Sequence, residues 1–356
     1  MSKDLELKIR MNNIFWALGC YTRVDVKLAE HTFKEKSPLE LTDIDILGIR
    51  ILPDFAINFL LADCTSNRNI IRSPIQRVFW LRGVMEFFNA SHSYLCLGSN
   101  NPIQETQRVV AQKLGVTILN EDNLANLEKR IINSDAPQLQ LNKFEPWLYF
   151  EHNLTVLSKD LSRLISFRKY NYWLNPKYQN LHAIISIVKK HNRFVNEKDK
   201  LHKALIFDLL TLFVLSLLQM SAYVFNINPE NPEMELKSYF YGGYIEMKKR
   251  REIVDNIKKI INSQNQKLLF DDILKLDPDY LTNLFEIGFR FLNKPYDASQ
   301  VLRYLQVFLF EKILYNEQNQ QGMEYLESFP EITKKLTRDI IKFFCNATSL
   351  TEKLFI

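Results

Sequence analysis

Two neighbouring apolar segments of the sequence carry aspartates near one end, and these carboxylates are the side chains best suited to chemistry. Asp43 and Asp45 are two residues apart, and Asp63 and Thr65 stand in the same relation. Residues i and i+2 of a β-strand share a face, so each pair projects to one side. If the two strands are neighbours, Asp45 and Asp63 meet at one edge, where paired carboxylates hold Mg²⁺ or Mn²⁺. Such a cation activates water against a phosphoryl group. A solvated strand end without function fits the same spacing.

The elements that must position these acids follow from the hydrophobic pattern of the first 125 residues. Alternating or β-branched apolar runs predict strands, and apolar residues at helical spacing predict helices. Ser73 and Pro74 are expected to begin one of these helices as N-cap and first helical residue. The first three strands follow one another directly and can pair as hairpins, whereas the later strands alternate with helices. This order predicts a mixed α/β sheet flanked by helices. The expected order is helix 4–19, strands 21–29, 42–52 and 56–64, helix 73–88, strand 93–98, helix 102–114 and strand 116–119.

After about residue 125, long segments with helical periodicity replace the strand pattern. A typical domain has about 150 residues, so a chain of 356 residues suggests two domains. We expect a restriction-endonuclease-like α/β domain at 1–125, for reasons given below, a linker at 126–140 and an all-helical domain at 141–356. The expected helices of that domain are 154–168, 179–195, 199–225, 245–263, 275–292, 297–315 and 331–345.

The segment 209–229 has no charged residue and is long enough to span a bilayer. Polar residues such as Thr211, Ser216 and Gln219 recur through it, which favours a buried helix over a membrane span. We therefore expect no membrane partner. The four cysteines form no CxxC pair and the polar N-terminal residues contain no signal peptide, so the cytoplasm is the expected location and zinc is not expected.

The acids and the order of elements resemble those of PD-(D/E)XK nucleases, which have the restriction-endonuclease-like fold. The resemblance covers about residues 5–125 and depends on the runs WALGCYTRVDVKLAE, LELTDIDILGIRI, NFLLADCTSNRN and LGVTILNEDNL. In that family an Asp begins one strand and (Glu/Asp)-hydrophobic-Lys lies on the next. The first acid matches Asp45 and the second matches Asp63, whereas Thr65 stands where the family has lysine. The resemblance implies a metal-dependent DNA endonuclease with Mg²⁺ or Mn²⁺ as cofactor.

The replacement of the family lysine by Thr65 predicts weak activity or none. That lysine places the attacking water and stabilises developing negative charge, which a short neutral hydroxyl cannot do. Arg68 and Arg72 lie just downstream and could stabilise charge, but arginine stays protonated and is a poor base. The first helix offers Glu6 as an acid, without a clear inward position for it.

Basic clusters in the helical half predict contact with nucleic acid. Residues 1–125 hold 14 basic and 14 acidic side chains, so the net charge of +5 comes entirely from later residues. Basic residues beside aromatic ones suit phosphate contact and base stacking, although a solvated helix face has the same composition. The stretch 159–177 also interleaves Arg168 and Lys169 with aromatic residues. The expected contacts are Lys189, Lys190 and Arg193 in one cluster, and Lys248, Lys249, Arg250 and Arg251 in the other.

We therefore interpret the chain as a nucleic-acid-binding protein, with DNA the expected ligand and an attenuated or inactive nuclease-like domain. The resemblance implies a role in prokaryotic restriction or antiviral defence against mobile DNA. Two alternatives stay open: an active Mg²⁺-dependent DNA endonuclease using Asp45 and Asp63, and a structural subunit whose helical half recruits a protein partner. The sequence contains no GxxxxGK[ST], GxGxxG or GxSxG motif, so P-loop ATPase, Rossmann oxidoreductase and α/β-hydrolase functions have no support.

Overall fold

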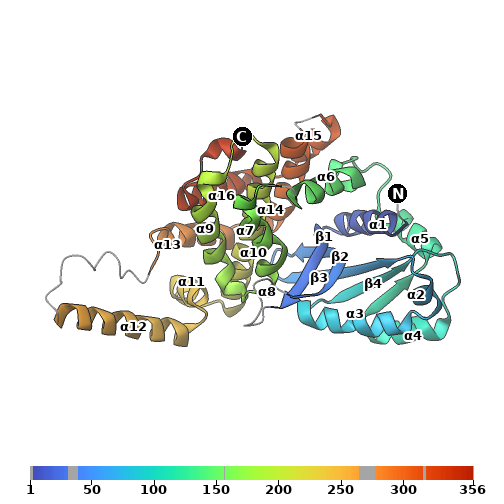
Figure 1. Cartoon of the computed structure of the whole chain (residues 1–356), viewed down its shortest axis with the longest axis horizontal. Helices are drawn as coiled ribbons and strands as arrows, with labels where there is room; N and C mark the ends of the chain where they lie inside the picture. The colour runs from blue at the N-terminus through green and yellow to red at the C-terminus, as the bar shows by residue number, and fades with distance from the viewer. Residues whose placement is uncertain (1–2, 31–38, 156, 264–276, 316–317, 356) are drawn as a thin grey trace.

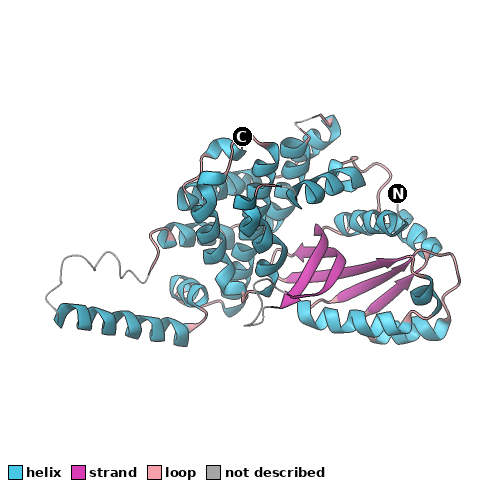
Figure 2. Cartoon of the chain, viewed as in Figure 1, coloured by secondary structure: helices cyan, strands magenta, loops and turns pink. Residues whose placement is uncertain are grey.

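The N-terminal part of the chain forms a five-stranded mixed sheet (Figures 1 and 2). The structure, a computed structural model, describes residues 3–30, 39–155, 157–263, 277–315 and 318–355. The first three strands pair antiparallel and the last three pair parallel, so the predicted mixed sheet is confirmed. In spatial order, which is also chain order, the strands are β1 (Tyr21–Glu30), β2 (Leu39–Ile51), β3 (Ile57–Thr65), β4 (His92–Leu97) and β5 (Val116–Leu119).

Helices cover both faces of this sheet (Figure 1). On one face α1 (Lys3–Ala17) and α5 (Glu121–Ile131) share an apolar cluster with Ile46 and Ala62. On the other face α3 (Ile75–Phe88) and α4 (Glu105–Lys113) pack on a second cluster. Helix α1 approaches β2 closely because Gly48 has no side chain: a Cβ there would lie 2.8 Å from the ring of Phe15. The predicted domain end at residue 125 falls inside α5, so the α/β half extends to residue 131.

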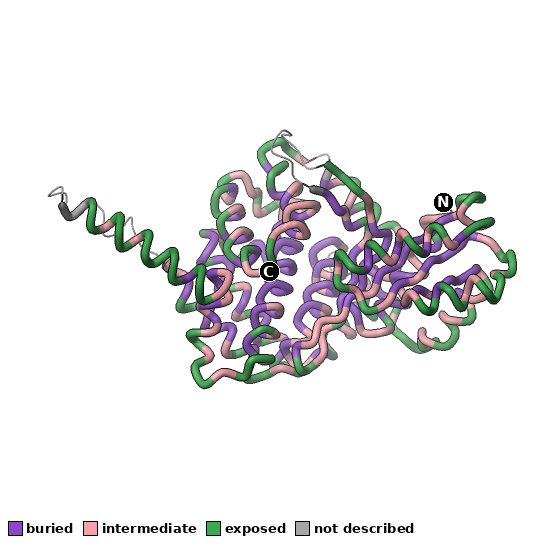
Figure 3. The backbone as a smooth tube through the Cα atoms, turned by 90° about the horizontal axis from the view of Figure 1, so that it is seen from below, coloured by how far each residue is buried: buried purple, intermediate pink, exposed green. Residues whose placement is uncertain are grey.

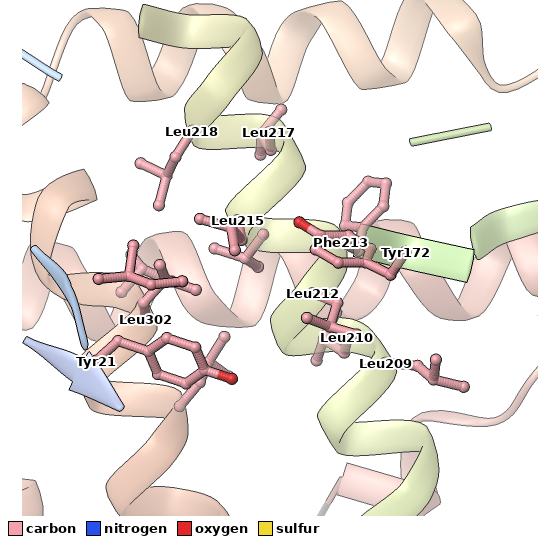
Figure 4. Packing of buried hydrophobic residues seen from close by; sticks show 14 of the residues in the cluster. Tyr21, Tyr172, Leu209, Leu210, Leu212, Phe213, Leu215, Leu217, Leu218 and Leu302 are labelled. Atoms are coloured by element: carbon pink, nitrogen blue, oxygen red, sulfur yellow. The ribbon is translucent and has the colours of Figure 1, made fainter. Parts of the chain in front are cut away.

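The rest of the chain is mostly helical, as predicted, and its helices surround α10 (Lys200–Ile227). Figure 4 shows the leucines of α10 packed beside Tyr21 of β1 and Leu302. Among the described residues α10 is the one helix long and apolar enough to cross a membrane, and 94% of its most apolar window is buried within the protein. The other main helices are α6 (Phe144–Thr155), α9 (Asn180–His191), α11 (Pro232–Tyr241), α12 (Tyr244–Ser263), α13 (Leu281–Leu292), α14 (Pro295–Val307), α15 (Gln320–Glu327) and α16 (Glu331–Thr348).

Several local predictions in the chain differ from the structure. The helix expected at 154–168 is replaced by α7 (Ser162–Ser166), a π-helical stretch (Phe167–Asn171) and α8 (Tyr172–Leu174). Five helices were not predicted: α2 (Arg68–Arg72), α5, α6, α11 and α15. Pro232 stands at the first position of α11, where proline is compatible with a helix. Ser73 does not cap α3, because it ends the short helix α2 (Arg68–Arg72) instead. Of the helix expected at 275–292, residues 275 and 276 lie outside the described residues.

A buried cluster of charges joins the sheet to the helical half. Both Nη atoms of Arg23 on β1 donate to Asp208 of α10, at 3.0 and 2.9 Å. Arg168 donates to Asp208 as well, and its Nη1 lies 2.9 Å from Oε2 of Glu151. Arg23, Arg168 and Asp208 are each at most 6% exposed. Two guanidinium groups and two carboxylates therefore neutralise one another at the junction.

The outer edge of β1 is closed by a side-chain amide. Gln306 of α14 accepts a hydrogen bond from the backbone N–H of Thr22 at 3.0 Å and donates to its carbonyl oxygen at 2.7 Å. These are the two bonds that a neighbouring strand would make. An unpaired strand edge is a template for association with other chains. At Thr22 the helical half covers this edge and so prevents such association.

Replacing Asp208 with Asn should destabilise the protein by about 3–5 kcal/mol, because it leaves two buried guanidinium groups without their shared carboxylate. Burial alone would raise the pKa of Asp208, but the charges of Arg23 and Arg168 outweigh it and hold the pKa below the ordinary value of 3.8. The stabilisation is therefore complete above that value and is lost as the pH falls below it. Urea unfolding at pH 7 measures the loss, with the exposed Asp160→Asn as the control. A loss under about 1 kcal/mol would show that the cluster contributes little.

Candidate functional site

Three aspartates stand side by side on β1, β2 and β3. The β1–β2 register pairs Val24 with Ile46 and Val26 with Ile44, which places Asp25 opposite Asp45. Asp63 follows Ala62, whose pairing with Ile46 is the last of the β2–β3 ladder, so Asp63 is the next residue opposite Asp45. The prediction that Asp45 and Asp63 lie on neighbouring strands agrees with this register. Asp25 is an additional acid that the sequence analysis did not select.

The carboxylate of Asp45 lies where β2 and β3 separate. The backbone N–H of Cys64, two residues beyond Ala62 of the last ladder pair, donates to Oδ2 of Asp45 at 2.6 Å. On the other side Asp25 has a left-handed backbone (φ +52°), which interrupts regular pairing between β1 and β2. Aspartate is among the few residues that adopt this conformation readily. The chain therefore departs from regular sheet geometry on both sides of Asp45.

Lys8 of α1 is the cation of this site, and the sequence analysis missed it. Its Nζ lies 2.7 Å from Oδ1 of Asp25 and 2.7 Å from Oδ1 of Asp45. Burial alone would lower the pKa of Lys8, but the charges of Asp45 and Asp25 outweigh it and raise the pKa well above the ordinary value. Lys8 is therefore charged whenever the protein is folded near neutral pH. The one sign of this contact in the sequence is that Lys8 directly follows Leu7, an apolar residue that faces the core.

Asp63 is held by a different cation, from the helix on the other face of the sheet. Nε of Arg77 donates to Oδ2 of Asp63 at 2.7 Å, and Nη2 donates to Oδ1, which makes a two-point ion pair. The guanidinium of Arg77 also lies over the ring of Trp80, 3.5 Å from its centroid. Near the start of α3, Arg77 therefore reaches the site, whereas the neighbouring Gln76 is exposed.

The acids as arranged do not fit the divalent metal that the resemblance implies. Oxygens of Asp25, Asp43 and Asp45 lie within 4.8 Å of one another, a spacing that a cation could use. The ammonium of Lys8 already contacts two of these residues, and Lys27 Nζ lies 3.3 Å from Asp43. Asp63 is outside that cluster. A metal shared by Asp45 and Asp63 would have to replace Lys8 on one side of the sheet and the Arg77 ion pair on the other.

The remaining residues expected at the site lie elsewhere. Thr65 is buried, and its hydroxyl accepts a hydrogen bond from the N–H of Asn67 at 3.1 Å, so its visible role is in the turn after β3. Arg68 and Arg72 are exposed on α2, and Glu6 is exposed on α1. The ion pairs given by the structure at Asp45 and Asp63 come from Lys8 and Arg77, and the downstream arginines are not among them.

Asp25, Asp45 and Asp63 form what we call the acid row. A cavity of about 270 Å³ lies beside it, between the sheet and the helical half. Lys8 and Asp25 line it on the sheet side, and Arg168, Lys169 and Trp173 line it on the helical side. Arg168, which belongs to the basic and aromatic stretch 159–177, is 5% exposed and bound to Asp208 and Glu151, so its guanidinium is not available to a phosphate group.

The two basic clusters expected to bind nucleic acid are exposed but separate. Lys189 and Lys190 end α9, and Arg193 follows them, whereas the cluster Lys248–Arg251 lies on α12. Helix α12 begins beside Tyr178, at the opposite end of α9, since a Cβ on Gly242 would lie 2.6 Å from the Tyr178 ring. Helix α9 has 12 residues and is about 18 Å long, so one cluster lies at one end of it and α12 begins at the other. Figure 3 shows α12 projecting from the body of the protein.

Comparisons of the chain with protein-family models, with curated proteins and with solved structures give no match. Function therefore has to be inferred from the residues and their geometry.

The stability of the protein should fall as the pH rises from 3.8 to about 6, because burial raises the pKa of Asp45 to about 6 despite the opposing charge of Lys8. A carboxyl group whose pKa is higher in the folded state favours folding most when it is protonated. The expected change is about 2–3 kcal/mol, and Asp45→Asn should remove it. Urea unfolding across this pH range measures the effect, with Asp160→Asn again as the exposed control. The same slope in Asp45→Asn as in the parent would contradict the assignment.

Proposed function

We propose that this chain is a nucleic-acid-binding protein with a nuclease-like α/β domain that cuts DNA poorly or not at all. The observation that carries the proposal is the pairing of each expected metal ligand with an internal cation: Asp45 with Lys8, and Asp63 with Arg77. A carboxylate held in a two-point contact with a guanidinium is costly to transfer to a metal, since the guanidinium loses its partner.

The nuclease-like character of the domain is part of this proposal. It is supported by the element order, in which one helix, three antiparallel strands, a helix and a parallel strand follow one another, and by the two acids just beyond the last pair of the β2–β3 ladder. A role in prokaryotic restriction or antiviral defence is proposed from the resemblance alone, and a cytoplasmic location from the cysteine pattern and the polar N-terminal residues.

Nucleic-acid binding is assigned to α12. Lys248, Lys249, Arg250 and Arg251 are all exposed on a helix that projects from the body of the protein, which suits contact with a phosphate backbone (Figure 3). Phosphate contact by lysine and arginine provides most of the sequence-independent affinity for DNA. Duplex DNA is the proposed ligand, and the second cluster at the end of α9 is too distant to join the same short contact.

An active Mg²⁺-dependent endonuclease is the second candidate, and the position of Lys8 favours it. The expected lysine is absent at Thr65, but Lys8 brings an ammonium to within 2.7 Å of Asp45 from α1. The presence of Thr65 in place of a lysine is therefore a weaker reason to expect inactivity. The ion pair of Arg77 with Asp63 remains, and it is the stronger reason to expect little cleavage.

A structural subunit that recruits a protein partner is favoured by a different observation on α12. Ile245, Ile253 and Ile257 are exposed on that helix, at 68%, 57% and 38%. Exposed large apolar side chains gathered on one element are typical of protein contacts. Salt dependence separates this candidate from the first, because apolar contacts do not weaken steeply as salt increases.

Replacing Lys248, Lys249, Arg250 and Arg251 with Ala should weaken binding to a labelled DNA duplex and flatten its salt dependence. Each lost phosphate contact lowers the slope of log affinity against log salt by about one unit. Fluorescence anisotropy between about 50 and 200 mM salt measures the slope. The matched control replaces four exposed basic residues elsewhere, Lys113, Lys129, Arg130 and Lys335. Equal slopes in the two variants would remove α12 as the DNA contact, and binding insensitive to salt would favour the protein partner.

The unmodified protein should leave plasmid DNA uncut with Mg²⁺ or Mn²⁺, and Arg77→Gln should bind Mn²⁺ more tightly because Asp63 is then unpaired. Calorimetric titration with Mn²⁺ measures this directly. Arg82→Gln is the matched control, since Arg82 lies on the same helix and pairs with Glu86 instead. Cleavage by the unmodified protein that disappears in Asp45→Asn and Asp63→Asn would establish the active endonuclease.

A further inference from the structure

A second and larger cavity, of about 590 Å³, lies at the junction of the two halves, apart from the acid site. The end of α1, the end of α5 and the connecting segment 132–139 form one side, and α14 and α15 provide Arg303 and Tyr325 on the other. The connecting segment is held in place, since Gln138 bonds through its N–H to Gln321 and through its carbonyl oxygen to Asn319. Preformed cavities of this size between structural units are common small-molecule sites.

The charged residues that line this cavity are both cations, Arg303 and Lys143. Among the residues that the structure describes, no aspartate or glutamate lines it. The guanidinium of Arg303 lies over the indole of Trp16, 4.0 Å from its centroid, and its Nη2 donates to the carbonyl oxygen of Trp16 at 3.2 Å. Its Nε is buried and has no hydrogen-bond partner among the described residues. Lys143 is exposed at the rim.

Arg303 is half-buried, and it differs from the buried Arg23 and Arg168 because no carboxylate among the described residues pairs with it. Burial lowers the pKa of Arg303, and the groups that oppose this are Tyr325 and Cys20, neither of which is a carboxylate. Arg23 and Arg168, by contrast, are bound to Asp208. A guanidinium that is partly withdrawn from water, with a buried Nε and no carboxylate beside it, is suited to bind an external anion.

The rest of the lining suits a planar polar ring. Trp16 and Tyr325 stand at an angle with ring centroids 6.5 Å apart. The amide side chains of Asn13, Gln138 and Asn142 also line the cavity. The Oδ1 atoms of Asn13 and Asn142 are buried acceptors without a donor among the described residues. Aromatic faces beside amide groups are the surfaces that recognise nucleobases, through stacking and hydrogen bonds to the ring edge.

We propose that this cavity binds a mononucleotide, with its phosphate at Arg303 and Lys143 and its base against Trp16 and Tyr325. The site is separate from the acid row and from α12, so it does not depend on the function proposed above. Neither a free nucleoside nor inorganic phosphate satisfies both parts of the lining. Each should therefore bind more weakly than the whole nucleotide.

Isothermal titration calorimetry on the full chain tests this with three sets of probes: the four ribonucleoside 5′-monophosphates, the corresponding nucleosides, and inorganic phosphate. At least one monophosphate should bind, and its nucleoside and inorganic phosphate should bind at least about tenfold more weakly. Arg303→Met and Lys143→Met should each weaken nucleotide binding by about tenfold or more. Arg163→Met, an exposed arginine on α7, is the matched control and should leave binding unchanged.

Three results would overturn the proposal. They are no binding of any monophosphate up to about 1 mM, phosphate binding as tightly as the nucleotide, or nucleotide binding unchanged in both Met variants. If Arg303→Met does not fold, Lys143→Met decides alone, because its side chain is exposed at the rim. The α12 variant with four Ala substitutions should keep full nucleotide affinity, and a loss there would place the ligand on the basic helix instead.

Discussion

The contact of Arg23 and Arg168 with Asp208 is the constraint that holds the two halves of the molecule in one arrangement. Charges this deeply buried are tolerated only when they are paired in good geometry. Moving the two halves apart would break these ion pairs and let water into the junction. Arg23 fixes β1 against α10, and Gln306 then closes the strand edge beside it. The cavity next to the acid row exists because Arg23 and Arg168 line its wall.

Helix α1 connects the three regions of interest through residues on different turns. Lys8 bridges Asp25 and Asp45. One turn later the amides of Asn12 and Asn13 donate to the carbonyl oxygens of Leu141 and Asn142, both at 3.1 Å, where the helical half begins. Trp16, near the end of the helix, lies under Arg303. A shift of α1 along the sheet would therefore change the acid row, the junction and the larger cavity together, and Gly48 restricts that shift by letting Phe15 approach β2 so closely.

Sequence patterns predicted the sheet well because strand signals are local. Alternation, β-branched runs and turn residues identified all five strands, and the register then followed from which residues face the core. The contacts that decide the site are not local. Arg23 and Asp208 are 185 residues apart, and the alternating pattern of β1 suggested that Arg23 faced solvent. Lys8 belongs to a helix whose polar residues look alike in the sequence, and only the packing of α1 over β1 and β2 selects it.

The cations that pair with Asp45 and Asp63 come from two different helices, and this determines which substitutions would free the two acids for a metal. Lys8 comes from α1 on one face of the sheet and Arg77 from α3 on the other (Figure 1). Each ion pair keeps a mostly buried carboxylate compensated, so each stabilises the fold while it withholds that acid from a metal. Removing one cation frees one acid and leaves the other paired. Two separate substitutions on two helices are therefore needed before Asp45 and Asp63 can share a ligand, and each of them leaves a buried charge without its partner. The arrangement in which Asp45 and Asp63 are ion-paired is therefore more stable than one in which the two acids share a metal.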